Sequence, residues 1–146
     1  MTPRRIIIHH SATVDSGTVS WNAIRRYHMG LGWGDVGYHC AVELVTDAAG
    51  FTFPEILIGR APDVAGAHTK GHNHDSLGVC VVGNYDAAPP PDAVWDRAVC
   101  LVAWLCRHYS IQPDHVHGHR DFARKSCPGV LFDMHLFRGD VRGQLA

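Results

Sequence analysis

The chain has 146 residues, a formal net charge of −1 and 46% hydrophobic residues. These values are typical of one soluble globular domain, and such a small charge gives no general attraction to nucleic acid or to an anionic membrane. No run approaches the ~20 apolar residues of a membrane span. The amino terminus also lacks the roughly 7–15 apolar residues of a secretory signal. We therefore expect a cytoplasmic monomer that has neither nucleic acid nor membrane as a partner.

The order of the predicted elements indicates a single α/β domain with a central mixed sheet. Strands are expected at residues 4–10, 38–46, 51–58, 77–82 and 115–117, from apolar and β-branched runs. Helices are expected at residues 20–29 and 93–109, with Ser20 and Asp92 as N-caps, and at residues 131–137. A polar loop over residues 60–76 is long enough to suggest a function. This order favours a sheet with helices on both faces and a site in a cleft at the strand ends.

The five cysteines are an odd number, which argues against a closed disulfide framework. Four lie in apolar runs and are expected to be small buried residues: Cys40, Cys80, Cys100 and Cys106. Cys127 differs because it follows Arg124, Lys125 and Ser126. Nearby cations lower the pKa of a thiol, so Cys127 is the cysteine that we expect to be a thiolate.

Three side chains are candidate metal ligands: His9 at the end of the first strand, and His119 and Cys127 in a late loop. Two neutral imidazoles and one thiolate suit Zn²⁺, and three protein ligands leave one position for water, as in catalytic sites. Because residues alternate along a strand, His115, His117 and His119 could also face one way, so a three-histidine site is an alternative. A thiol hydrolase that uses Cys127 with His119 and Asp121 is another alternative.

Four stretches taken together resemble the type 2 N-acetylmuramoyl-L-alanine amidases, the family of small phage lysozyme-amidases and peptidoglycan recognition proteins. They are IIIHHSAT, GWGDVGYHCAV, AGAHTKGHNHDSLGVCVVGNYD and HGHRDFARKSCPG, in the order of the family. The resemblance runs from about Arg5 to Phe137. In its length, and in the expected lack of a separate cell-wall-binding domain, the chain is most similar to the zinc amidases of T7-like phages.

The resemblance implies one Zn²⁺ per chain, held by His9, His119 and Cys127. It implies catalytic roles for Tyr38 and for Lys125, whose ammonium group would stabilise an oxyanion. The implied reaction is hydrolysis of the amide between the lactyl group of N-acetylmuramic acid and L-alanine of the peptidoglycan stem peptide. All five positions match the family, which favours an active enzyme.

Further residues are candidates for contact with peptidoglycan or muropeptides. His68 occupies a family landmark and is expected to line the substrate cleft, with His39 and Asn73 as weaker candidates. Trp33 is a candidate surface for stacking on a sugar, although a tryptophan among glycines is equally typical of a packing residue.

The resemblance predicts a phage endolysin that reaches the wall after a separate protein has opened the membrane. Two alternatives are a cytoplasmic muropeptide-recycling amidase and a non-catalytic peptidoglycan-binding module.

Overall fold

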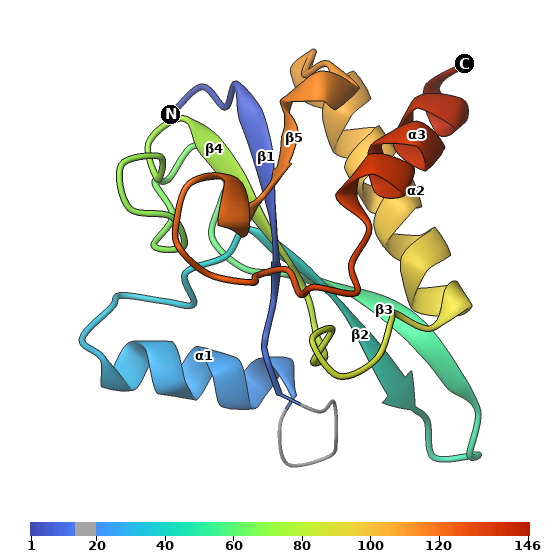
Figure 1. Ribbon diagram of the computed structural model, residues 1–146. Coiled ribbons are helices and arrows are strands. Elements are labelled where there is room, and N and C mark those ends of the chain that lie inside the picture. Colours follow the sequence, from blue (N-terminus) through green and yellow to red (C-terminus); the bar gives the residue numbers. More distant parts are fainter. Residues whose placement is uncertain (14–19) are drawn as a thin grey trace.

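The computed structural model of the protein describes residues 1–13 and 20–146, and their strands form one mixed sheet (Figure 1). The strands are β1 (Arg5–His10), β2 (Cys40–Thr46), β3 (Thr52–Ile58), β4 (Ser76–Val81) and β5 (Val116–Gly118), in the order β3-β2-β4-β1-β5. β1 runs parallel to both β4 and β5, β2 runs parallel to β4, and β3 pairs antiparallel with β2. The predicted mixed sheet is therefore confirmed.

Burial explains which apolar runs become central strands. Ile6, Ile7 and Ile8 of β1 are fully buried, and every residue of β4 is buried. A strand between two parallel neighbours has both faces covered, so its central residues form an apolar run without alternation. β3 lies at the edge of the sheet, where it is mostly exposed and accommodates Pro54.

Helices cover both faces of the sheet, as predicted. α2 (Asp92–Tyr109) and α3 (Met134–Leu145) lie against one face, and α1 (Trp21–Gly30) lies on the other (Figure 1). The α2 side packs with Ile8 and Val79, whereas Trp21 of α1 packs with Cys80. Successive residues of a strand face opposite ways. His9 follows Ile8 and therefore lies on the face of the sheet that α1 covers.

Several predicted details were wrong. The last helix spans Met134–Leu145, because Asp133 caps it by accepting hydrogen bonds from the His135 and Leu136 amides and because its buried residues recur at helical spacing. Asp92 is the first helical residue, and Pro91 is the N-cap. Ser20 does hold the N-cap position of α1 but makes no side-chain capping bond.

Cys100 is exposed rather than buried, because it lines an open groove between α2 and α3. The other three cysteines of the apolar runs are buried, as predicted. None of the described helices is long and apolar enough to cross a membrane.

Candidate metal centre and catalytic cleft

The parallel pairing of β1 with β5 brings two histidines together. Ile8 is in register with Gly118, so His9 and His119 each follow one position later at the carboxyl ends of neighbouring strands. η2 (His119–Asp121) begins directly after β5, and the His9 and His119 ring centroids are 4.5 Å apart. Clefts for ligands commonly form at this end of parallel strands.

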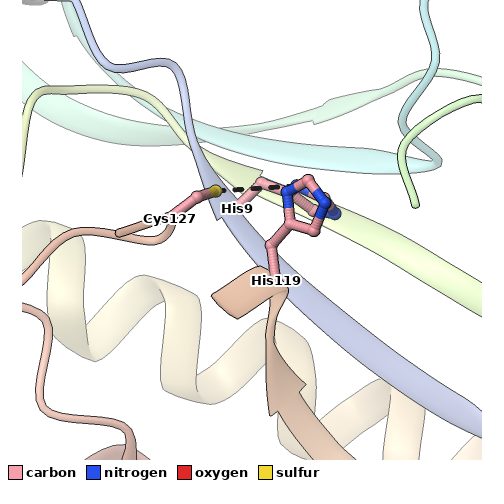
Figure 2. A group of neighbouring side chains, drawn as sticks. All are labelled: His9, His119 and Cys127. Carbon is pink, nitrogen blue, oxygen red and sulfur yellow. Dashed lines mark hydrogen bonds between the residues drawn. The ribbon is translucent and has the colours of Figure 1, made fainter. Parts of the chain in front are cut away.

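Arg120 folds the following loop back so that Cys127 approaches these histidines. Its amide donates a 2.7 Å hydrogen bond to the Cys127 carbonyl, and its guanidinium donates to the Gly129 and Phe132 carbonyls at 2.7 and 2.9 Å. The Cys127 Sγ then lies 3.7 Å from His9 Nδ1 (Figure 2). Arg120 therefore positions the third candidate ligand.

The three predicted ligands fit a zinc ion. One ligand atom from each of His9, His119 and Cys127 lies within 4.8 Å of the others. Tetrahedral zinc with bond lengths of about 2.0–2.3 Å would require ligand separations of roughly 3.3–3.8 Å. The 3.7 Å between Cys127 Sγ and His9 Nδ1 already lies in that range.

Burial sets the protonation states of these ligands. It lowers the pKa of His9 well below 6.5, helped by the neighbouring His68 and His119. Burial likewise lowers the pKa of His119, with Lys125 adding to the effect. Both imidazoles are therefore neutral near pH 7, which is the form that coordinates a metal.

The thiolate predicted for Cys127 is wrong for the metal-free protein. Burial raises the pKa of Cys127 to about 11 and outweighs the lowering effect of Lys125 and Arg120. Nearby cations are visible in the sequence, but the burial of the sulfur is not. A metal that binds this thiol would displace its proton.

The two alternative sites receive no support from the geometry. His115 lies in the short 3₁₀ helix η1 (Pro113–His115) and is exposed, so the predicted three-histidine alignment is not formed. Asp121 Oδ2 accepts a hydrogen bond from the Gly118 amide and lies 3.6 Å from His117 Nδ1. The Asp121 carboxylate thus has partners other than His119, and the raised pKa of Cys127 also disfavours a thiolate nucleophile.

Tyr38 lies beside the metal ligands, with its ring centroid 5.1 Å from that of His9. Burial raises the pKa of its hydroxyl well above 10, and nearby Cys80 and Cys127 add to this. The hydroxyl therefore stays protonated and can donate a hydrogen bond. Lys125 is exposed on the wall of the same cleft.

These residues open onto one groove. Its first part has a volume of about 470 Å³, and an adjoining part has a volume of about 520 Å³. The first part is lined by His9, His10, Ala12, His28, Trp33, Tyr38, Ala67, His68, Asp86, His119, Lys125, Ser126 and Cys127. Trp33, His68 and Lys125 line both parts, so these predicted residues share one surface with Tyr38 and the candidate ligands.

The two weaker substrate candidates lie in different surroundings. Asn73 lines the second part of the groove, and its Oδ1 accepts hydrogen bonds from the His68 and Thr69 amides. His39 is 2% exposed and does not line the groove. Its Nδ1 accepts from the Gly78 amide, and its Nε2 donates to the Val64 carbonyl. A substrate contact by either residue stays a prediction.

Sequence reasoning gave no role to three residues that shape the cleft. Arg120 holds the Cys127 loop, and His28 Nδ1 accepts a 2.9 Å hydrogen bond from the Gly37 amide. The buried Glu43 accepts a 2.6 Å hydrogen bond from the Trp21 amide at the start of α1. Glu43 could have been found, because a lone acid in an apolar strand requires a buried partner.

Comparison with known proteins identifies the class. Residues 1–130 match the profile of the family described as N-acetylmuramoyl-L-alanine amidase. The chain belongs to this family. Among its relatives, the endolysin of Enterobacteria phage T3 is 34% identical over 139 residues, covering 91% of this chain and 83% of that protein. The family resemblance found in the sequence is thereby confirmed.

Solved structures share the fold. The N-acetylmuramoyl-L-alanine amidase LysC of Clostridium intestinale superposes with a TM-score of 0.81 at 22% identity, covering 97% of this chain and 87% of that one. A variant of Drosophila PGRP-LB in complex with tracheal cytotoxin has a TM-score of 0.72 at 27% identity, covering 93% and 81%. The α/β fold predicted from the sequence is therefore that of the amidases.

Proposed function

We propose that the protein is a zinc-dependent endolysin that hydrolyses the amide between N-acetylmuramic acid and L-alanine of the stem peptide. Membership of the amidase family supports the reaction, and the likeness to a phage endolysin over most of both chains supports the endolysin role. The observation that carries the proposal is the group of His9, His119 and Cys127, whose ligand atoms lie within 4.8 Å of one another at the end of the groove.

We expect the residues of the groove to have separate roles in the reaction. A zinc ion held by His9, His119 and Cys127 would polarise the scissile carbonyl and acidify water. The protonated hydroxyl of Tyr38 would donate a hydrogen bond to the reacting oxygen beside His9. Lys125, on the groove wall, would stabilise negative charge that develops on the carbonyl oxygen.

Peptidoglycan is the proposed substrate, with the groove as its binding surface. PGRP-LB, which shares this fold, is known in complex with tracheal cytotoxin. In this chain His68 and Trp33 line both parts of the groove, and Asn73 lines the second. We propose that these residues contact substrate, and that residues 1–146 act as a monomeric catalytic domain.

Digestion of purified peptidoglycan tests the reaction. New L-alanine amino groups that vanish with a chelator and return with Zn²⁺ are the expected result. New reducing sugar ends would indicate a glycosidase and refute the proposal. No product would instead favour a peptidoglycan-binding module. Activity on small anhydro-muropeptides alone would favour a recycling amidase over an endolysin that reaches the wall after membrane opening.

Two substitutions distinguish the role of Cys127 as a metal ligand from the electrostatic role of Lys125. Cys127→Ser should abolish zinc retention and turnover while the fold is kept, and Cys100→Ser is the matched control because Cys100 is exposed on α2. Lys125→Ala should lower the turnover rate with zinc still bound. Full activity of Cys127→Ser would refute the ligand assignment, and loss of zinc from Lys125→Ala would show that the lysine has a different role.

A further inference from the structure

His68 makes a direct contact with a proposed metal ligand. Its Nδ1 lies 3.0 Å from His9 Nε2, and the two rings meet edge to face with centroids 5.0 Å apart. The other nitrogen of His9, Nδ1, faces Cys127 Sγ at 3.7 Å. The His9 ring is therefore held between His68 on one side and the candidate metal centre on the other.

The hydrogen bonds around His68 favour a proton on Nε2. Ser76 Oγ donates to the His72 carbonyl and lies 3.5 Å from His68 Nε2, so its oxygen is left to accept a hydrogen from that nitrogen. With the proton on Nε2, the Nδ1 of His68 carries a lone pair. It can then accept the hydrogen of His9 Nε2, which leaves the lone pair of His9 Nδ1 directed toward Cys127.

The His68 ring is tightly packed by its surroundings. The side chain is only 9% exposed. An added Cβ at Gly78 would lie 2.6 Å from two ring carbons of His68, and one at Gly66 would also clash with the ring. Thr69 is 2% exposed, and its hydroxyl lies 3.0 Å from His68 Nδ1 and 3.4 Å from His9 Nε2. The absence of a side chain at Gly66 and Gly78 thus leaves room for this ring beside His9.

We propose that His68 is a positioning residue that fixes the tautomer and orientation of His9, so that His9 Nδ1 faces the metal centre. Metal-ligating histidines generally need such a partner on the second ring nitrogen, and its loss typically weakens metal binding 10–100-fold. This role goes beyond the substrate contact expected of His68 and rests on the proposed metal centre.

The test compares two substitutions of similar size. His68→Asn keeps a polar atom near the position of Nδ1, whereas His68→Leu replaces it with a methyl group. Zinc affinity, measured by competition with a chromophoric chelator, should fall roughly 10–100-fold in His68→Leu and should stay within a few-fold of the original protein in His68→Asn. Unchanged affinity in His68→Leu, or equal loss in both variants, would overturn the proposal.

A second measurement does not depend on either variant folding or on zinc binding. Nitrogen-15 NMR of the zinc-free protein should show His9 protonated on Nε2 and unprotonated on Nδ1. The opposite tautomer would overturn the positioning role. If the original protein shows the expected tautomer but binds no zinc, the proposed function fails and the geometric inference stands.

Discussion

Arg120→Ala tests whether one guanidinium holds the Cys127 loop in place. The side chain is half-buried and donates to two carbonyls further along the loop, those of Gly129 and Phe132. The Arg120 amide bond to the Cys127 carbonyl is a backbone contact, so it is not removed directly by the substitution. The substitution therefore isolates the two guanidinium contacts.

The size of the effect follows from these two hydrogen bonds. A hydrogen bond to a charged donor contributes about 1.5–3 kcal/mol, and partial exposure of Arg120 favours the lower end. We expect a loss of about 3 kcal/mol in the free energy of unfolding. For a domain of this size, each kcal/mol lowers Tm by about 2–4 °C, so Tm should fall by about 6–12 °C.

Thermal unfolding of the zinc-free protein measures this loss, and chelator competition measures the zinc affinity. Arg124→Ala is the matched control: it removes the same side chain from the same loop, and the structure shows no side-chain hydrogen bond of Arg124 with any described residue. We expect the control to keep the original Tm and affinity. A Tm change of less than about 2 °C in Arg120→Ala would refute the argument, because it corresponds to under ~1 kcal/mol.

Three further outcomes are expected. Burial lowers the pKa of His68 to about 3 from 6.5, so the zinc-free protein should lose about 1.4 kcal/mol of stability per pH unit from this group as the pH falls from 6.5 toward 3. A Tm that stays constant from pH 7 to 4 would contradict this. Tyr38→Phe should reduce kcat by roughly 10²-fold with zinc affinity unchanged, and full activity would remove the hydroxyl from the mechanism. Gly129→Ala should lower the free energy of unfolding, measured by chemical denaturation, by roughly 2–4 kcal/mol. The reason is that φ of Gly129 is +118° and that the new Cβ would lie 2.6 Å from the Tyr85 carbonyl oxygen. An unchanged free energy of unfolding would show that the loop can rearrange.

The central strands could be predicted because burial on both faces leaves a strong pattern in the sequence. β1 contains the apolar run of residues 6–8 and β4 that of residues 77–81, and the structure places both strands inside the sheet. The end of α3 could not be predicted in the same way. Gly139 and Gly143 suggest an end to the helix, yet the helix continues through both of them and buries Val141 on its inner face. Tertiary packing thus overrides a weak local preference.

The candidate ligands could be predicted because His9 ends a predicted strand, and because His119 and Cys127 flank a basic loop and match the family motifs. The contacts that orient them could not. Neither the His68–His9 contact, between residues 59 apart, nor the bonds from Arg120 to the Gly129 and Phe132 carbonyls leaves a periodic signal. Periodicity tells which face a side chain occupies, but it does not tell which atom it meets there.

Cys127 shows how burial changes a conclusion drawn from neighbouring charges. The cations beside it predict a reactive thiolate, yet the folded chain buries the sulfur next to His9 and raises its pKa to about 11. The same burial keeps His9 and His119 neutral. A protonated thiol beside two neutral imidazoles is a poor nucleophile but a suitable ligand set, because zinc can displace the thiol proton and bind all three. Burial therefore favours the metal centre over the thiol hydrolase at the same three residues.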